Sequence, residues 1–361
     1  MKRSFFGTAA ALLAAVLFFA VPADAISAQK AILLDADSGR VLYEKDANST
    51  SLIASTTKIM TALVVCEQCN VLDRVKIPKE AVGIEGSSLY LKEGEVLTVQ
   101  ELLYGMMLHS GNDAATALAI YCGGTVEGFV QLMNDKVRFL GLKNTHFANP
   151  HGLDNRENYS TAADLAALAA YAMDNPIFAQ TVSSKSLRIG ERTLTNHNKL
   201  LWQVEGVDGV KTGYTKAAGR LLVSSAVRDG RRLVAVTIND GNDWADHKKL
   251  LENGFSQFTS QQIVIEGQII GRVAVLGGET AWVQIRAAED FSYAMAQGEQ
   301  ARILLSPPGF VYAPVAENQD AGFAYICIGD KTVGKIRVCY TQTVEQAKAP
   351  EKSFWQKLFG R

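Results

Sequence analysis

In residues 26–258, short apolar runs lie near both ends, and between them apolar residues recur with helical spacing over a long stretch. Residues 31–34 and 41–43 are separated by a turn sequence and read as a pair of strands. From about residue 208 the pattern is again β-like, and Asp229-Gly230 between two apolar runs predicts a hairpin. Strands from both ends, with helices packed against them, predict an α+β domain over residues 26–258.

The middle of this region has the signals of several helices. Residues 98–122 carry two helical patterns, and Ser110-Gly111-Asn112 interrupts them. An Ala/Leu-rich helix is predicted at 160–174, capped by Ser160 or Thr161. The pattern at 243–258 predicts a helix that closes the domain.

The remainder of the chain differs in pattern. Residues 262–345 hold short β-rich runs with turns between them, and we expect a separate small β domain without catalytic groups. Residues 346–361 read as a polar linker and an amphipathic helix. Four large apolar side chains share one arc of that helix, so we expect it to lie on the outer face of the cytoplasmic membrane. Docking of the helix on its own protein is the alternative.

The first 25 residues indicate export. Lys2 and Arg3 precede an apolar run, and Ala23-Asp24-Ala25 offers the small residues that a signal peptidase reads. A cleaved signal peptide over residues 1–25 is therefore predicted; an uncleaved anchor helix is the alternative. The protein is expected on the outer side of the cytoplasmic membrane, at the cell wall.

Composition narrows the choice of function. The chain has 361 residues, of which 48% are hydrophobic and 20% charged, which suits two domains with cores of their own. Its formal net charge of −1 offers no basic field for nucleic acid. The scattered histidines predict no metal site, and no cofactor motif is present. Five cysteines leave at least one unpaired, and Cys66 and Cys69 are predicted to be small buried hydrophobes rather than a redox pair.

Candidate chemistry begins with Ser55-Thr56-Thr57-Lys58. Residues three apart share one helical face, so the Lys58 amine can reach the Ser55 hydroxyl. A serine becomes nucleophilic when a base takes its proton, and a buried lysine of lowered pKa can be that base. At the start of a helix, the Ser55 N–H could also bind an oxyanion. An SxxK motif alone is weak evidence for a catalytic serine, because a serine that caps a helix, followed by an exposed lysine, gives the same pattern.

Two further elements extend the set. Ser110 and Asn112 could place a proton-relaying hydroxyl and an orienting carboxamide in a cleft, although an ordinary turn would look alike. Lys211, Thr212 and Gly213 follow on a β-like run. The lysine and threonine suit a substrate carboxylate, and Gly213 would let an extended peptide approach the strand. The N–H of the next residue, Tyr214, could be the second oxyanion donor; an exposed lysine before a glycine turn is the alternative.

The order SxxK, SxN, KTG is the signature of penicillin-binding proteins and class A β-lactamases. Beyond these motifs the sequence resembles the low-molecular-weight penicillin-binding proteins that act as serine-type D-alanyl-D-alanine carboxypeptidases. The resemblance rests on "LLDADSGRVLYEKDAN", "ASTTKIMTAL", "LTVQELLYGMMLHSGNDAA", "NPHGLD" and "GVDGVKTGYTKAAGRLLVSSA". It implies a β-lactamase/penicillin-binding-protein-like catalytic domain, an antiparallel sheet with helices, followed by a small β-rich domain.

The resemblance also implies a substrate and roles. Ser55 would attack peptidoglycan stem peptides that end in D-Ala-D-Ala, with Lys58 as base and Ser110 as proton relay. Asn112 would orient, Lys211 and Thr212 would hold the terminal carboxylate, and β-lactams would acylate the same serine.

Two alternatives remain at this stage. A serine β-lactamase of class A would use an added glutamate in an ExxLN segment, but the chain has no Leu-Asn dipeptide. A non-catalytic wall-binding protein could keep the fold, although the three intact motifs argue against it.

Overall fold

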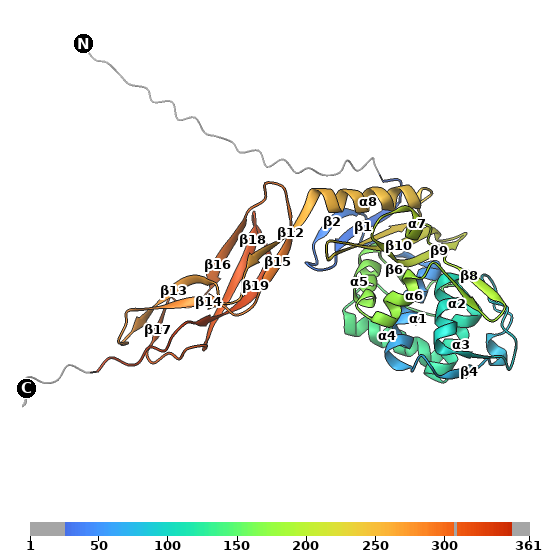
Figure 1. Ribbon diagram of the computed structural model, residues 1–361, viewed down its shortest axis with the longest axis horizontal. Helices are drawn as coiled ribbons and strands as arrows, with labels where there is room; N and C mark the ends of the chain where they lie inside the picture. The colour runs from blue at the N-terminus through green and yellow to red at the C-terminus, as the bar shows by residue number, and fades with distance from the viewer. Residues whose placement is uncertain (1–25, 307–308, 349–361) are drawn as a thin grey trace, which may run out of the picture.

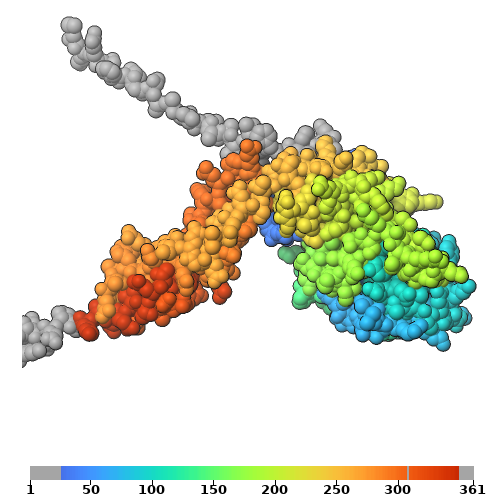
Figure 2. Space-filling view, viewed as in Figure 1, coloured from blue at the N-terminus to red at the C-terminus, as the bar shows by residue number. Residues whose placement is uncertain are grey.

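The computed structural model describes residues 26–306 and 309–348, which form two lobes joined by a narrow neck (Figures 1 and 2). The signal peptide predicted at 1–25 lies outside the described residues, and so does the helical tail predicted near the C-terminus. No helix within the described ranges is long and apolar enough to cross a membrane.

The larger lobe is built on one five-stranded antiparallel sheet. Its strands come from the two ends of the region and lie in the order β2-β1-β11-β10-β9, which agrees with the predicted α+β class. Asp229 and Gly230 form the expected tight turn between β10 and β11. The strands are β1 (Lys30–Asp35), β2 (Val41–Lys45), β9 (Val207–Thr215), β10 (Gly219–Arg228) and β11 (Arg231–Ile238).

Helices cover both faces of this sheet (Figure 1). The larger apolar core lies between the sheet and α1 (Lys58–Gln68), α2 (Val99–Leu108), α3 (Asn112–Gly123), α4 (Val126–Leu140), α5 (Ala162–Met173) and α6 (Pro176–Ser183). A smaller core packs α7 (Leu200–Gln203) and α8 (Asp243–Gln257) against the opposite face. Thr161 caps α5, one of the two residues expected to do so.

Three small two-stranded sheets and two short 3₁₀ helices complete the described part of the larger lobe. The paired strands are β3 (Ser51–Leu52) with β6 (Tyr159–Ser160), β4 (Arg74–Lys76) with β5 (Val96–Thr98), and β7 (Ser186–Ile189) with β8 (Arg192–Thr195). The 3₁₀ helices are η2 (Ala54–Thr57) and η3 (Lys79–Ala81).

The smaller lobe consists of strands alone. It begins with β12 (Phe258–Val264), directly after α8 and before the expected residue 262. β12 pairs with β15 (Phe291–Ala296), and the other strands form a six-stranded sheet ordered β16-β18-β19-β14-β13-β17 around its own core. These are β13 (Ile269–Leu276), β14 (Trp282–Ala287), β16 (Ala301–Ser306), β17 (Phe310–Tyr312), β18 (Asp320–Ile328) and β19 (Lys331–Tyr340).

One side chain of the larger lobe reaches across the neck. Arg40, in the turn between β1 and β2, donates to both carboxylate oxygens of Glu299 at 2.6 and 2.7 Å. It also donates to the carbonyl of Ala294 at 2.7 Å. Its guanidinium lies 5.0 Å from the ring centroid of Phe258 and 5.5 Å from that of Tyr293. The two lobes are therefore joined by an ion pair and aromatic contacts as well as by the chain.

Candidate active site

Ser55 lies in the 3₁₀ helix η2, and Lys58 is the first residue of α1. The sequence pattern suggested one helix beginning at Ser55, but the α-helix begins three residues later. The Ser55 hydroxyl does not cap this helix: no side chain makes a capping hydrogen bond at the start of η2 or of α1. Lys58 is fully buried, so it is not the exposed lysine that the alternative interpretation of the SxxK motif requires.

The amine of Lys58 has three polar neighbours. Its Nζ lies 3.0 Å from Oγ of Ser55, 2.7 Å from Oδ1 of Asn112 and 2.5 Å from the backbone carbonyl of His151. The last two are carbonyl oxygens, which only accept hydrogen bonds. A neutral amine can donate one N–H to each carbonyl and keep its lone pair for the serine hydroxyl.

Gly152 allows the His151 carbonyl to reach this position. Its φ of +91° is a backbone conformation that favours glycine. A Cβ at residue 152 would lie 1.9 Å from the carbonyl oxygen of Ala54, so no side chain fits there. The "NPHGLD" segment thus packs directly against the backbone that carries Ser55.

Burial and a second cation set the electrostatics of Lys58. Burial lowers its pKa well below the ordinary lysine value, the nearby Lys211 lowers it further, and Asp113 acts in the opposite direction. Burial also lowers the pKa of Lys211 to about 7. Loss of hydration disfavours the charged form of a lysine, and a like charge adds to this effect. Both amines therefore titrate well below the usual lysine range.

Ser110 and Asn112 come from the break between α2 and α3. Ser110 has a φ of +64°, an uncommon conformation for a residue with a side chain, and such strain often marks a functional position. Asn112 begins α3 and donates from Nδ2 to the carbonyl of Glu85 at 2.6 Å. This bond assigns the other amide atom, Oδ1, to Lys58. The break predicted from the sequence is thus a rigid turn that carries both side chains.

Strand β9 forms the free edge of the sheet beside these residues and carries Lys211 to Tyr214. Lys211 is buried and donates to the carbonyl of Thr212 at 2.9 Å, whereas Tyr214 is 65% exposed. Gly213 differs from the expectation that its missing side chain makes room for a peptide. A Cβ there would lie 3.3–3.4 Å from Thr56 and Ala54, so the glycine permits close packing of β9 on η2.

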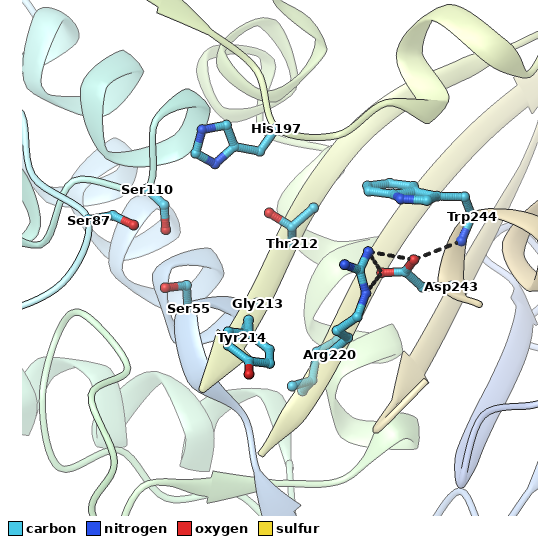
Figure 3. A pocket seen from close by; sticks show the side chains of 11 residues that line it. Ser55, Ser87, Ser110, His197, Thr212, Gly213, Tyr214, Arg220, Asp243 and Trp244 are labelled. Atoms are coloured by element: carbon cyan, nitrogen blue, oxygen red, sulfur yellow. Dashed lines mark hydrogen bonds and ion pairs between the residues drawn. The ribbon is translucent and has the colours of Figure 1, made fainter. Parts of the chain in front are cut away.

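A cavity of about 300 Å³ opens between the serines and the β9 edge (Figure 3). Ser55 and Ser110 lie on one side, with Ser87 and His197 near them, and Thr212 projects between these residues and Arg220. Burial, with Lys211 as a further cause, lowers the pKa of His197 to about 4, so its ring is neutral at pH 7. The cavity is lined by Ser55, Ser87, Ser110, His197, Thr212, Gly213, Tyr214, Arg220, Leu221, Asp243 and Trp244.

Arg220 and Asp243 are lining residues that the sequence analysis did not identify. The guanidinium of Arg220 donates to both carboxylate oxygens of Asp243 at 2.8 Å (Figure 3). The Arg220 side chain is 44% exposed and that of Asp243 only 3%. Neither residue belongs to the SxxK, SxN or KTG motif. The only signal was that an arginine follows "KAAG" at the start of β10.

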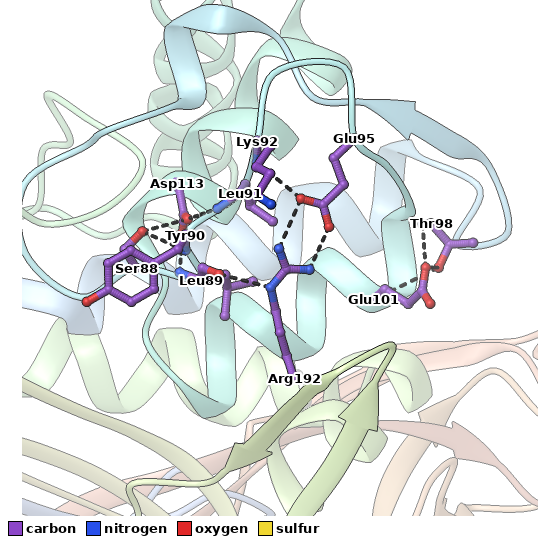
Figure 4. Close-up of polar contacts among 10 residues, drawn as sticks. All are labelled: Ser88, Leu89, Tyr90, Leu91, Lys92, Glu95, Thr98, Glu101, Asp113 and Arg192. Atoms are coloured by element: carbon purple, nitrogen blue, oxygen red, sulfur yellow. Dashed lines mark hydrogen bonds and ion pairs between the residues drawn. The ribbon is translucent and has the colours of Figure 1, made fainter.

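Asp113 is a third residue whose role the sequence motifs did not indicate. Its buried carboxylate accepts from the backbone N–H groups of Leu89 at 3.0 Å and Leu91 at 3.1 Å, and from the Ser88 hydroxyl at 2.7 Å (Figure 4). These bonds hold the loop that supplies Ser87 to the cavity. A buried carboxylate accepting several N–H bonds is an anchor whose sequence signal is only an aspartate in the first turn of a helix.

Arg192 fixes the same loop from the β7–β8 hairpin. Its Nε donates to the carbonyl of Leu89 at 2.9 Å, and its two terminal nitrogens contact the Glu95 carboxylate at 2.6 and 3.0 Å (Figure 4). Bidentate pairs of this kind restrict both partners to one geometry. In the described part of the chain, no group of three or more His, Cys, Asp or Glu side chains is placed to hold a metal ion.

The fold and this site define a serine-type peptidase of the penicillin-binding class. Residues 18–242 match the Peptidase_S11 family model, described as D-alanyl-D-alanine carboxypeptidase. Residues 258–346 match the model for the C-terminal domain of penicillin-binding protein 5. The chain belongs to the D-alanyl-D-alanine carboxypeptidase family, as its motifs predicted.

Individual relatives agree with this assignment. The chain is 33% identical over 311 residues to D-alanyl-D-alanine carboxypeptidase DacF of Bacillus subtilis, covering 82% of this chain and 80% of the relative. It is 33% identical over 353 residues to DacA of Escherichia coli, covering 92% and 86%. Penicillin binding protein 5 of Haemophilus influenzae superposes with a TM-score of 0.78 at 32% identity, covering 89% of this chain and 98% of that one. The comparisons do not favour the β-lactamase or wall-binding alternatives.

Proposed function

We propose that the protein removes the terminal D-alanine from peptidoglycan stem peptides through an acyl-enzyme on Ser55. The observation that supports this best is the Lys58 amine, which is buried, 3.0 Å from Ser55 Oγ, and otherwise faces carbonyl oxygens. Among the described residues, no carboxylate hydrogen bonds to this amine to keep it protonated. It can therefore accept the serine proton, a step that contributes about 10²–10⁴-fold to rate.

In the proposed reaction, Ser55 Oγ attacks the carbonyl carbon of the penultimate D-alanine while its proton passes to Lys58. The N–H groups of Ser55 and Tyr214 stabilise the oxyanion, and Asn112 orients both Lys58 and the substrate amide. The C–N bond then breaks, and the proton returns through the Ser110 hydroxyl to the leaving D-alanine amine. Water next attacks the ester, again with Lys58 as base, and restores Ser55.

Lys211 and Thr212 are proposed to hold the terminal carboxylate of the substrate. Burial makes the charge of Lys211 costly in the free enzyme, with a pKa lowered to about 7. A carboxylate placed beside it would raise that pKa and fix the positive charge. The site thus favours a ligand with a negative end, which suits a carboxypeptidase and also β-lactam antibiotics, whose carboxylate would occupy the same position.

The decisive experiment is intact mass spectrometry after incubation with penicillin, and separately with a peptide ending in D-Ala-D-Ala. We expect a covalent penicillin adduct on Ser55 and stoichiometric release of D-alanine. Ser55→Ala should abolish both, and Lys58→Ala should slow acylation by at least about 10²-fold. Ser87→Ala is the matched control: Ser87 lines the same cavity, and this variant should still be acylated on Ser55. An adduct on the Ser55→Ala protein would overturn the assignment.

We further infer that the protein works outside the cytoplasm, held at the membrane by its C-terminal segment. The support is the sequence alone: the signal pattern at 1–25, and Phe354, Trp355, Leu358 and Phe359 on one arc with basic residues outside it. Residues 26–258 would be the catalytic domain, and residues 262–345 a spacer. Sedimentation with anionic liposomes tests the anchor. The mature protein should pellet, and a version ending at Pro350 should not.

A further inference from the structure

Cys69 and Cys122 are half-buried cysteines at the C-terminal ends of α1 and α3. Both helices have their N-terminal ends in the active site. α1 starts at Lys58 and ends at Cys69, its C-cap, while α3 starts at Asn112 and carries Cys122 in its last turn. The contact between Lys58 Nζ and Asn112 Oδ1 joins the two starting ends, and the helices pack against one another. From these starts, Cys69 is 11 residues on and Cys122 is 10 residues on. At 1.5 Å per residue they lie about 16 and about 15 Å along their helices, hence at the same level.

The two thiols, both free in the structure, are neighbours. The thiol of Cys122 is the leading cause of a lowered pKa at Cys69, and the thiol of Cys69 is the leading cause of a raised pKa at Cys122. Tyr121, next to Cys122, donates from its hydroxyl to the carboxylate of Asp73 at 2.8 Å, and Asp73 lies four residues after Cys69. The segment after α1 and the C-terminal end of α3 are therefore in contact, which places Cys69 near Cys122.

The other three cysteines are arranged differently. Cys66 is buried in the helical core, and burial raises the pKa of its thiol to about 12, so it is a poor nucleophile. Cys327 and Cys339 lie on β18 and β19, but Cys327 is opposite Thr332 and Cys339 is opposite Asp320 in the strand register. Among the described cysteines, Cys69 and Cys122 are the pair whose thiols are neighbours.

We propose that Cys69 and Cys122 form a disulfide bond that clamps the α1–α3 pair at the end opposite the catalytic contact. The oxidant is a disulfide of the glutathione class. The Cys69 thiolate attacks it and releases one thiol, and the Cys122 thiolate then attacks the mixed disulfide and releases the second. Two protein thiols lose two protons and two electrons, and one disulfide molecule is reduced to two thiols.

The link would act on stability more than on chemistry. It closes a loop from residue 69 to residue 122 that contains Ser110 and Asn112. Cross-linking a loop of this length restricts the unfolded chain, so reduction should lower the melting temperature by roughly 5–15 °C. The link also keeps the two helices side by side, which preserves the distance between Lys58 and Asn112 on heating.

The test is thiol counting and peptide mapping on the mature wild-type protein. After incubation with oxidised glutathione and alkylation in denaturant, we expect three free thiols, the five cysteines of the chain minus two. Trypsin without reductant should yield residues 59–74 linked to residues 93–136. Because residues 59–74 contain both Cys66 and Cys69, the mapping is repeated on Cys66→Ala, which should keep the link. Five alkylated cysteines, or a link between Cys66 and Cys69, would overturn the proposal.

A matched variant tests the stabilising role. Cys122→Ser should melt at one temperature whether or not reductant is present, while the wild type should melt lower after reduction. If the wild type carries the link but its melting temperature does not fall on reduction, the clamp has no stabilising role and that part of the proposal is wrong.

Discussion

The amide oxygen of Asn112 lies 2.7 Å from the amine of Lys58, and each residue is the first of its helix. The other amide atom of Asn112 is engaged by the carbonyl of Glu85, so the side chain cannot turn its nitrogen toward the lysine. Asn112 thus offers Lys58 an acceptor without a negative charge. A carboxylate at the same place would stabilise the protonated lysine and remove the base.

Asn112→Asp should therefore raise the pKa of Lys58 and slow acylation at neutral pH. An opposite charge at hydrogen-bond distance shifts a pKa by about 1–3 units, which corresponds to about a ten- to a thousandfold loss of rate below the new pKa. The second-order rate of penicillin acylation, measured across pH, checks this. The variant should regain activity as the pH rises.

Asn112→Ala distinguishes the effect of the added negative charge from the effect of losing the hydrogen bond between Asn112 and Lys58. This variant should acylate slowly at every pH, with its ascending limb not displaced to higher pH. If Asn112→Asp shows the same pH profile as the wild type, Lys58 is not the group whose deprotonation controls acylation.

The wild-type enzyme should have a bell-shaped dependence of kcat/KM on pH. Lys58 has a lowered pKa and acts when unprotonated, so activity rises as the pH passes that value. Lys211 acts when protonated, so in the free enzyme activity falls as the pH passes about 7. Because the two lysines influence one another, the pKa values read from the two limbs of the profile describe the pair rather than either lysine alone. In kcat the falling limb should lie at higher pH, since the bound carboxylate raises the pKa of Lys211.

Two variants of Lys211 test whether this residue causes the falling limb of the pH profile. Lys211→Arg keeps its charge throughout, so the limb should disappear while the preference for a free carboxylate remains. Lys211→Ala should lose about one to two powers of ten on the acid but little on the peptide amide, because a charge-assisted contact is worth about 1.5–3 kcal/mol. Equal losses on acid and amide would place Lys211 in the proton-transfer network instead.

Asp113→Asn should destabilise the protein through the loop drawn in Figure 4. The change keeps the shape of the side chain but removes the charge that accepts from Leu89, Leu91 and Ser88. Hydrogen bonds to a charged group are worth about 1.5–3 kcal/mol, so the melting temperature should fall by roughly 3–12 °C. Glu127→Gln is the control, an exposed acid at the second position of α4. Similar melting of both variants would show that Asp113 does not anchor the loop.

Much of the architecture was predictable because its signals are local. The strand periodicity at both ends, the Asp-Gly turn before Arg231 and the break at 110–112 each depend on residues close in sequence. The SxxK, SxN and KTG motifs are short as well, and each spans at most four residues. Their order was enough to predict the α+β fold and the family.

Contacts between distant segments could not be read from the pattern. The carbonyl that faces Lys58 belongs to His151, and its position depends on the absence of a side chain at Gly152. Asp113 resembles any acid in a first helical turn until the loop folds over it. Arg220 enters the cavity because β10 lies beside β9, a relationship set by strand order rather than by sequence distance.

The last prediction concerns the neck between the lobes. Arg40 is largely buried there, with 18% of its side chain exposed, and it contacts Glu299, Ala294 and two aromatic rings. Arg40→Ala should leave penicillin acylation of Ser55 unchanged, because Arg40 is not among the residues that line the cavity. It should widen the range of lobe orientations, since a bidentate ion pair and two ring contacts are lost while the chain connection through α8 and β12 remains. Small-angle X-ray scattering would register this as a larger and broader maximum dimension. Arg302→Ala is the control, since Arg302 is 62% exposed and 3.9 Å from Asp330 within the smaller lobe. If Arg40→Ala and Arg302→Ala scatter alike, the chain connection alone sets the lobe arrangement and the Arg40 contacts do not.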